Sequence, residues 1–522
     1  MIPRFLPVAV VDAAGASACD AAAIAAGIPS RALMQRAGAA AAAEIVRRYH
    51  DRLATGVVVA TGPGNNGGDG WVVGHALHAA GVRVRVVECV PALTADSRAE
   101  REQARAAGVE TSGRIDDLHS GGESLVVDAV LGTGLSADGA LRGDIAVAVE
   151  SLRRLAERGA MLVALDVPTG LVASNGRSTG GLRCALTITF GTIKRGHLVA
   201  REACGTIVVV DIGLGAHARD AGERMRLATP GWFAAALPRI SADAHKGTRK
   251  KIAIVGGARG MAGAVVLAAR AALRSGAGLV RCVVAPESLP AIQEAEPAAL
   301  AATWPTDDTA LDALAGWADA LLVGPGLGGG ARELVERLLG AWKGPVVLDA
   351  DALNAFAGDT AALGVLLDRR QALLTPHPAE FGRLAGLDVD AVLDGRFDLP
   401  ARLAEDTGAA VLLKGVPTVI ASHGAPTCVV AEGTPVLATG GAGDLLGGIA
   451  ATLLAQTGDA PLAGALAAFA HGRAAAAVSA NQVRGYTLED VVHALTSVWS
   501  IAADTPCPPV LAELPAVGEP AP

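Results

Sequence analysis

Short apolar runs rich in valine, isoleucine and threonine alternate with alanine-rich segments along most of the chain. This pattern predicts strands that are buried on both faces of a parallel sheet and are joined by helices. In the first half the predicted strands lie within GVVVATG, VRVRVVECV, SLVVDAVLG, MLVALDVPTG, ALTITFG and GTIVVVDIG. The first half is therefore predicted to be an α/β domain.

The alternation lapses between residues 216 and 245 and restarts at Lys251. The second set of predicted strands lies within KIAIVGG, LVRCVVA, ADALLVGPGLG, GPVVLDADALN, QALLTPHPAEF, AAVLLKG and PTVIASHG. The pattern predicts an α/β fold class with two domains, at residues 1–225 and 226–505. The proline-rich segment 506–522 is predicted to be a disordered tail.

The composition of the chain favours a folded globular protein and argues against several other classes. The chain has 522 residues, of which 51% are apolar and 18% charged, and these values suit two folded cores. A net charge of −8 argues against a nucleic-acid-binding surface. Charges or glycine-rich breaks interrupt every long apolar run, so no membrane span is expected. The seven scattered cysteines form no CxxC pair, which predicts free thiols in a cytoplasmic protein and no zinc site.

The sequence GPGNNGGDG at residues 62–70 follows one predicted strand directly. Glycines at the end of a parallel strand let backbone N–H groups approach an anion, and the following helix adds a favourable dipole. The spacing is neither GxGxxG nor a Walker loop, so a tight strand–helix connection stays open as the alternative. Asn65, Asn66 and Asp69 favour a binding site, because their side-chain oxygens can coordinate a hard cation or orient hydroxyl groups.

Two further strand ends of the first half carry carboxylates. Asp128 lies inside VVDAVLG and Asp166 ends the apolar run of ALDVPTG. A carboxylate in an apolar strand is costly unless it is paired or bound to a cation. The carboxyl ends of parallel strands line the ligand crevice of open α/β sheets, which favours one shared site. Each aspartate taken alone could instead cap a helix or turn.

The second glycine-rich stretch, ATGGAGDLLGGI at residues 438–449, predicts a glycine turn that opens an apolar helix. The amides of 441–443 would form an anion hole, and Asp444 would take a proton from a hydroxyl that is being phosphorylated. An ordinary N-cap aspartate is the alternative. Lys414 supports the functional interpretation, because it ends a predicted strand and only six of the 44 basic residues are lysine.

His377 and Glu380 stand between prolines in TPHPAEF, directly after an apolar run. A histidine in such a position is also typical of an exposed turn, and that alternative stays open. GPGLG at 324–328 and LDADALN at 348–354 add another glycine turn and two acids at strand ends. The second half thus gathers acids, a lysine and glycine turns where a phosphoryl-transfer site would lie.

The first half resembles the NAD(P)H-hydrate epimerases. The resemblance rests on LMQRAG, GPGNNGGDG, VDAVLGTGL, LDVPTGL, TITFGTIKRGH and VVDIGLG, in family order across residues 10–215. It implies a Rossmann-like sandwich that interconverts the R and S forms of hydrated NADH and NADPH at C6 of the nicotinamide ring. It also implies a potassium ion held by Asn66, Asp128 and Thr169. The implied substrate contacts are Asn65, Asn66, Gly67, Gly68, Asp69, Gly132, Thr133, Gly134, Leu135, Ser136, Ala137, Asp138 and Asp166.

Epimerisation through loss and return of the C6 hydroxyl needs a proton donor and a proton acceptor. Asp166 is the first choice for this acid–base work and Asp69 the second. A non-catalytic binding module is the alternative for this half, and the intact acids argue against it.

The second half is similar to ribokinase-like proteins and specifically to the ADP-dependent NAD(P)H-hydrate dehydratases. The matching pieces are HKGTRKKIAIVGGARGMAGA, AALRSGAGLV, GPGLG, VLDADALN, LTPHPAEF, LLKG and ATGGAGDLLGGI. The resemblance implies that Asp444 binds the hydrate and acts as a base, and that Mg²⁺ takes part. The other implied hydrate contacts are Ala264, Gly326 and His377, and the implied nucleotide contacts are Lys414, Gly415, Val416, Pro417, Thr418 and Gly443. Ala379 and the GGAGD element depart slightly from the family pattern.

These resemblances predict a bifunctional repair enzyme for hydrated nicotinamide nucleotides. The second half would phosphorylate the C6 hydroxyl of the S hydrate with ADP, release AMP, and eliminate phosphate to restore NAD(P)H. The first half would convert the R hydrate to S. The expected partners are these small molecules and further copies of the chain, with neither nucleic acid nor membrane. A different small-molecule kinase, with a stable phosphorylated product, stays open for the second half, as does the choice between ADP and ATP.

Overall fold

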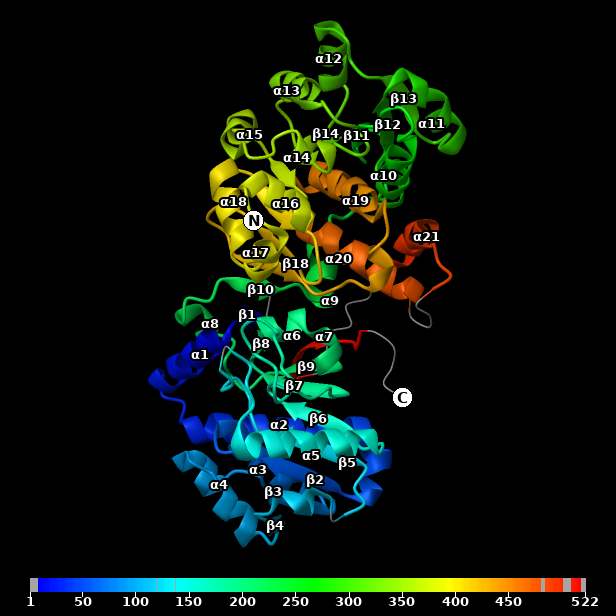
Figure 1. Ribbon diagram of the computed structural model, residues 1–522. Helices are drawn as coiled ribbons and strands as arrows, with labels where there is room; N and C mark the ends of the chain where they lie inside the picture. The colour runs from blue at the N-terminus through cyan, green and yellow to red at the C-terminus, as the bar shows by residue number, and fades with distance from the viewer. Residues whose placement is uncertain (1–7, 120, 137, 480–483, 501–507, 518–522) are drawn as a thin grey trace. The chain divides into compact units, whose positions relative to one another are not determined.

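The computed structural model describes residues 8–119, 121–136, 138–479, 484–500 and 508–517 (Figure 1). The chain forms two compact units, which divide between Met225 and Arg226. The last strand, β20 (Val510–Leu514), belongs to the N-terminal unit although it lies near the end of the chain. The segment 216–245, where the strand pattern lapses, contains only short elements: α8 (His217–Asp220), β10 (Met225–Leu227) and α9 (Pro230–Ala236).

The N-terminal unit is built on an eight-stranded sheet in the order β20-β9-β7-β6-β5-β2-β3-β4. Its strands are β2 (Val57–Thr61), β3 (Val84–Glu88), β4 (Glu110–Ser112), β5 (Leu125–Ala129), β6 (Met161–Leu165), β7 (Leu186–Phe190) and β9 (Thr206–Val210). All neighbours run parallel except β20, which is antiparallel to β9. A separate parallel pair joins β1 (Ala9–Val11) to β8 (Thr192–Lys194).

Alternate residues of these strands pack on opposite faces of the sheet. Val57 and Val59 share one core with α2 (Ser30–Tyr49), α3 (Asn65–Ala79) and α4 (Ala95–Ala106). Val58 and Ala60 pack on the other face, against α5 (Gly143–Glu157). Burial on both faces explains why the strands appear in the sequence as nearly continuous apolar runs. The unit is completed by α1 (Ala13–Ala25), α6 (Arg195–Val199) and α7 (Arg201–Cys204).

The order of strands in this sheet fixes where a ligand can bind. From β2 the chain proceeds through β3 to β4 on one side, and then returns to β5 on the other side of β2. Crevices in open α/β sheets form at such a reversal, outside the carboxyl ends of the strands. The loops after β2 and β5 meet there, and they contain the first glycine stretch and the residues after Asp128.

The C-terminal unit has a sheet in the order β13-β12-β11-β14-β15-β16-β17-β18-β19. The strands from β13 to β17 run parallel, and β18 and β19 add antiparallel pairs. Their bounds are β11 (Lys251–Val255), β12 (Leu279–Val284), β13 (Leu300–Thr303), β14 (Ala320–Val323), β15 (Val346–Leu348), β16 (Ala372–Leu374), β17 (Ala410–Leu413), β18 (Thr418–Ala421) and β19 (Thr427–Val430).

Helices cover both faces of this second sheet. One face packs against α10 (Ala262–Arg274), α19 (Ala442–Thr457), α20 (Ala460–Ser479) and α21 (Leu488–Val498). The other packs against α13 (Arg332–Ala341), α15 (Thr360–Leu367), α16 (Pro378–Ala385) and α18 (Leu399–Thr407). The remaining helices are α11 (Leu289–Ala295), α12 (Asp308–Ala315), α14 (Asp351–Asn354) and α17 (Val389–Asp394).

The prediction of a disordered tail over 506–522 is wrong for residues 510–514, which form β20. Val510, Ala512 and Leu514 are buried against the N-terminal unit, and Glu513 points outward to Arg48, with 2.6 Å between its Oε2 and the Arg48 Nη2. Edge pairing with β9 and burial of alternate side chains outweigh the effect of the flanking prolines. Residues 506, 507 and 518–522 of that segment lie outside the described residues.

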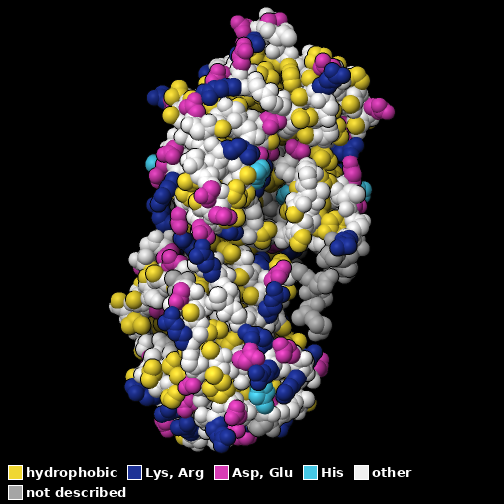
Figure 2. All heavy atoms as spheres, in the orientation of Figure 1, with side chains coloured by type: hydrophobic (Ala, Val, Ile, Leu, Met, Phe, Trp, Pro, Cys, Tyr) yellow, Lys and Arg dark blue, Asp and Glu magenta, His cyan; other side chains and the backbone are white. Residues whose placement is uncertain are grey.

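Acidic and basic side chains are interspersed over the face of the molecule shown in Figure 2. Among the described residues, none of the helices combines the length and apolar character that crossing a membrane requires.

Candidate active sites

Glycines allow the loops of the N-terminal site to touch. A Cβ on Gly62 would lie 2.0 Å from the carbonyl oxygen of Val130, and one on Gly67 would lie 2.0 Å from that of Gly62. The loop after β2, the first turn of α3 and the loop after β5 therefore pack backbone against backbone. This close approach gives a structural reason for part of the glycine stretch, and it also brings the polar residues of the two loops to one place.

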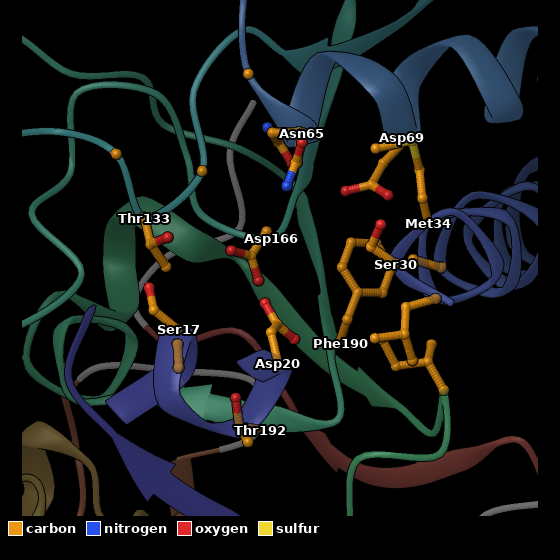
Figure 3. A pocket seen from close by; sticks show the side chains of 18 of the residues that line it. Ser17, Asp20, Ser30, Met34, Asn65, Asp69, Thr133, Asp166, Phe190 and Thr192 are labelled. Atoms are coloured by element: carbon orange, nitrogen blue, oxygen red, sulfur yellow. The ribbon is translucent and has the colours of Figure 1, made fainter. Parts of the chain in front are cut away.

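These loops and α1 border a cavity of about 390 Å³ (Figure 3). The predicted site residues that line it are Asn65, Asn66, Asp69, Gly132, Thr133, Gly134 and Asp166. Gly67, Gly68, Leu135, Ser136 and Asp138 are not among its lining residues in the described part of the chain, and Ala137 lies outside the described residues. Asp138 is instead an exposed carboxylate that accepts hydrogen bonds from Ser136 and Arg142.

Asp166 is held by a buried lysine. It follows β6 in a left-handed conformation with φ 61°, which costs a non-glycine residue about 1 kcal/mol. Its Oδ1 accepts hydrogen bonds from the Lys194 ammonium and from the Thr189 hydroxyl, the latter at 3.0 Å. Burial raises the pKa of Asp166, but the charge and hydrogen bond of Lys194 outweigh it, so the pKa lies below its ordinary value. Asp166 is therefore ionised at neutral pH.

Lys194 ends β8, and its side chain is only 3% exposed. The backbone N–H of Lys194 donates to Nδ1 of His197 at 3.3 Å, which fixes the start of α6. Burial, followed by the charge of Lys194, lowers the pKa of His197 to about 3, so this histidine is neutral. The lysine is one of the few in the chain and stood inside a quoted motif, but no local pattern showed that it would reach Asp166.

Two more carboxyl groups face the same cavity. Burial, and after it the charges of Asp166 and Asp20, raises the pKa of Asp69 well above its ordinary value. Burial also raises the pKa of Asp20 to about 6, with Lys194 opposing and Asp166 adding to the rise. Asp69 was a predicted site residue. Asp20 was missed, because it lies in the middle of α1 and only the tertiary fold brings that helix to the strand ends.

Asp128 and Thr169 form a buried pair. Asp128 accepts hydrogen bonds from the backbone N–H of Thr169 at 2.8 Å and from its hydroxyl at 2.7 Å, and burial raises the pKa of Asp128 to about 6. Asn66 lines the cavity, and neither its side-chain oxygen nor its nitrogen has a hydrogen-bond partner among the described residues. No group of three or more His, Cys, Asp or Glu in the described chain is arranged to hold a metal.

The C-terminal site begins at the start of α19. Gly441, with φ 96°, turns the chain into the helix, and Asp444 lies in the first turn. A Cβ on Gly443 would lie 3.0 Å from the Lys414 ammonium, so the glycine leaves the lysine room beside the helix start. The predicted glycine turn, lysine and aspartate therefore come together at one end of the sheet.

Lys414 is paired with an aspartate that was not singled out as a site residue. Its Nζ lies 2.5 Å from Oδ1 of Asp349, which also accepts the Thr375 hydroxyl at 2.9 Å. Burial lowers the pKa of Lys414, but Asp349 outweighs this, and the pKa lies above its ordinary value. Asp349 belongs to LDADALN, so the sequence marked the segment without showing which acid would bind the lysine.

Lys414 forms its ion pair with Asp349 and not with Asp444. Burial, then the charge of Asp349, raises the pKa of Asp444 to about 7, although Lys414 opposes the shift. Asp351 and Glu380 add smaller upward contributions. A carboxyl group with this pKa changes its protonation state at neutral pH, as a general base in catalysis requires.

His377, a predicted hydrate contact, caps a helix in the structure. Its Nδ1 accepts the backbone N–H of Ala379 at 3.2 Å, and Glu380 accepts the backbone N–H of His377 at 2.8 Å, so the pair caps α16. The His377 side chain is 47% exposed. Burial and the charge of Lys414 lower its pKa, so the ring is neutral at neutral pH. A half-exposed, neutral His377 is compatible both with an exposed turn and with the predicted contact to the hydrate.

The remaining predicted contacts form two groups. A Cβ on Gly326 would lie 3.3 Å from that of Ala264, so these two residues are neighbours. The segment 415–418 is closed by the Thr418 hydroxyl, which donates to the carbonyl of Gly415 at 2.7 Å. His471 on α20 was missed: it is 6% exposed, and burial followed by the charge of Lys414 lowers its pKa to about 4.

Two α/β units, each with acids and a lysine at the carboxyl ends of parallel strands, define a two-domain α/β enzyme. Comparison with protein families narrows this class. The model described as NAD(P)H-hydrate dehydratase matches residues 252–497, and the model described as YjeF-related protein N-terminus matches residues 30–196. Each of the two units is therefore matched by a family model.

The chain is similar to proteins named bifunctional NAD(P)H-hydrate repair enzyme Nnr. It is 40% identical to the protein of Salinibacter ruber over 492 residues, covering 86% of this chain and 88% of the relative. It is 36% identical to that of Thermanaerovibrio acidaminovorans, covering 94% and 98%. A solved structure of Bacillus subtilis ADP/ATP-dependent NAD(P)H-hydrate dehydratase, co-crystallised with ATP/Mg²⁺, is 27% identical and covers 52% of this chain and 96% of that one, with a TM-score of 0.45.

The chain belongs to the family of bifunctional NAD(P)H-hydrate repair enzymes. The fold class is the predicted one, a two-domain α/β protein whose C-terminal unit is ribokinase-like.

Proposed function

We propose that this chain repairs hydrated NADH and NADPH by two activities. Its N-terminal unit interconverts the R and S hydrates, and its C-terminal unit dehydrates the S form with a nucleotide as phosphoryl donor. One observation carries the proposal. The chain matches bifunctional repair enzymes across both units, and each unit contains acids and a buried lysine in its candidate site.

In the C-terminal unit, Asp444 accepts the proton of the C6 hydroxyl as the hydroxyl oxygen attacks the terminal phosphorus of ADP. The bond from that phosphorus to the AMP oxygen breaks, and AMP leaves. The N–H groups in the first turn of α19 support this step, because they are suited to hold the transferred group and the helix dipole favours its negative charge. Phosphate then leaves C6 while C5 loses a proton, which restores the C5–C6 double bond.

The nucleotide contacts in this proposal are Lys414, Gly415, Val416, Pro417, Thr418 and Gly443, and the hydrate contacts are Ala264, Gly326, His377 and Asp444. Closeness of Lys414 to Gly443 supports one shared phosphate region. Mg²⁺ fits the site, because the carboxylates that raise the pKa of Asp444 would be offset by a divalent cation. When bound, Mg²⁺ supplies charge neutralisation of the phosphates, with Asp349 and Asp351 as candidate ligands.

In the N-terminal unit, Asp166 carries out the acid–base step at C6, with Asp69 as the second proton-transfer group. The loop residues Asn65–Asp69 and Gly132–Asp138 contact the substrate. The ionised state of Asp166 supports a base, and the raised pKa of Asp69 supports a group that enters the reaction protonated.

Potassium is proposed to bind at Asn66, Asp128 and Thr169. Two observations support a cation there: the buried amide of Asn66 has no hydrogen-bond partner among the described residues, and Asp128 is a buried carboxylate in an apolar strand. Replacing K⁺ by tetramethylammonium should lower the epimerase rate about 10-fold. Thr169→Val should reproduce this loss and Thr169→Ser should not. Equal rates in both salts would remove potassium from the proposal.

The main experiment gives the full-length protein a mixed R/S hydrate, first with ADP and then with ATP. Both activities together return all of the hydrate to NADH absorbance, and the faster nucleotide is the donor. Recovery of the S fraction alone would show an inactive first unit. A stable phosphorylated product without NADH would instead favour a small-molecule kinase.

A homo-oligomer in the cytoplasm remains part of the proposal. Light scattering of the purified chain tests the first expectation, and a fluorescent fusion in the source cell tests the second.

A further inference from the structure

The cavity of the N-terminal unit contains one acid more than the proposed function uses. Asp20 lies on α1, lines the cavity with Asp69 and Asp166, and is shown facing the same space in Figure 3. The surroundings of the Asp20 carboxyl group desolvate it enough to raise its pKa, yet the residue is exposed in the structure, whereas Asp69 and Asp166 are half-buried. Asp20 can therefore exchange a proton with cavity water more readily than either of the other acids.

The charges around Asp20 link it to the Asp166–Lys194 pair. The pKa of Asp20 responds to both Lys194 and Asp166, so the three groups form one electrostatic cluster. Its value of about 6 suits a group that must give up a proton and regain it in every turnover. Asp69, with a pKa well above the ordinary value, is better suited to keep its proton and orient the substrate by a hydrogen bond.

We infer that Asp20 is the catalytic acid of the epimerase and that Lys194 is a positioning residue that keeps Asp166 available as the base. The inference rests on the proposed function of this cavity and refines it, because it moves the acid role from Asp69 to Asp20.

The reaction balances with these two groups. The C6–O bond breaks, and the oxygen takes the proton of Asp20 and leaves as water. The lone pair of the ring nitrogen N1 forms a double bond to C6. Water then adds to C6 from the other face, its proton passes to Asp166, and the double-bond electrons return to N1. Transfer of that proton from Asp166 to Asp20, by way of water in the cavity that both side chains line, restores the starting state.

Asp20→Asn is the first test, made in the full-length chain. It should lower the epimerase kcat at least about 100-fold while KM for the hydrate changes little. Asp12→Asn is the matched control: Asp12 caps the same helix by accepting the N–H of Gly15 at 2.7 Å, and asparagine can keep that cap. Hydrate binding measured by calorimetry shows whether the cavity is intact. A wild-type kcat in Asp20→Asn, or an equal loss in Asp12→Asn, would overturn the inference.

Solvent oxygen tests the bond-breaking step. In H₂¹⁸O, each conversion of R to S should place one ¹⁸O on C6, and Asp20→Asn should slow conversion and incorporation together. Conversion without incorporation would contradict loss of the hydroxyl.

Lys194→Met tests the positioning role through the pH profile. Without the lysine the pKa of Asp166 rises, so the acid limb of the epimerase kcat profile should move to higher pH by about one unit or more. The other titratable groups facing Asp166 are Asp20, Asp69 and His197. Lys194→Arg should largely restore the wild-type limb. A lower kcat with an unmoved acid limb would show a structural role only and overturn the assignment of Lys194.

Asp166→Ala separates failure of this inference from failure of the proposed function. Full epimerisation in Asp166→Ala would eliminate Asp166 from the mechanism and so reject the base of the proposed function. An inactive Asp166→Ala beside a fully active Asp20→Asn would reject only the inference.

Discussion

Each candidate site contains a buried lysine–aspartate ion pair, but the paired aspartate has a different role in each site. In the N-terminal unit the buried lysine, Lys194, contacts Asp166, the proposed catalytic base, and lowers its pKa. In the C-terminal unit Lys414 contacts Asp349 instead, and the pKa of Asp444 stays raised at about 7. A lysine beside an acid therefore does not by itself show how that acid behaves. Whether the lysine contacts the reacting carboxylate or its neighbour decides between a permanently ionised base and one that titrates near neutral pH.

The largest expected effect is on the titrating acid. Asp444→Asn removes the only proposed acceptor for the hydroxyl proton and should lower dehydration of the S hydrate by about 1000-fold or more. Binding of the hydrate and the R-to-S reaction should stay unchanged, because neither uses Asp444. Chromatography of the epimers and NADH absorbance measure the two activities in the same protein, and full dehydration by this variant would reject Asp444 as the base.

Asp166→Ala is the corresponding change in the other unit. Interconversion of R and S should fall by about 100-fold or more, while dehydration of pure S hydrate proceeds at the wild-type rate. If dehydration fell equally, the two units would not be functionally separate as proposed.

Replacing Lys414 should shift the pH profile of the dehydration reaction, because Lys414 affects the pKa of Asp444. Wild-type dehydration should decline below about pH 7, as Asp444 becomes protonated. Lys414 opposes the rise in the pKa of Asp444, so its loss raises that pKa further and shifts the acid limb to higher pH by about one unit. Lys414→Met tested across pH with saturating nucleotide measures the shift, and a shift to lower pH would contradict the electrostatic account.

The smallest effects should come from the hydroxyls beside each ion pair. The Thr189 hydroxyl donates a hydrogen bond to Asp166, the proposed base. The Thr375 hydroxyl donates one to Asp349, which is the ion-pair partner of Lys414. Loss of one such hydrogen bond costs about 1 kcal/mol, so Thr189→Val should slow epimerisation about 5-fold. Thr375→Val should slow dehydration by less than about 3-fold. A larger effect for Thr375→Val would mean that the position of Asp349 matters to the reaction as much as that of the proposed base.

The sequence was informative where a feature is local. Doubly buried parallel strands appear as apolar runs. Asp128 lies inside one such run, Asp166 follows another directly, and Asp444 follows a glycine turn at the start of an apolar helix. These features predicted the fold class and the position of both candidate sites. The family resemblance then assigned a role to each residue.

The sequence was uninformative where a partner comes from a distant element. Asp20 reaches the cavity from α1 and Lys194 from β8, and neither stands beside a glycine turn. The choice of Asp349 over Asp351 as the partner of Lys414 depends on side-chain packing that no spacing encodes. For β20 a signal did exist, because VLAEL alternates buried and outward residues, but it is short and preceded by prolines.

The place of β20 has a consequence for synthesis. Its neighbour β9 ends at Val210, and β20 begins at Val510, so the sheet of the first unit acquires its last strand only when nearly the whole chain has been made. At bacterial and eukaryotic elongation rates the nascent first unit waits roughly 15–60 s with the edge of β9 unpaired. The half that leaves the ribosome first is thus the one whose folding finishes last, and its bare edge is where a chaperone would be needed during translation.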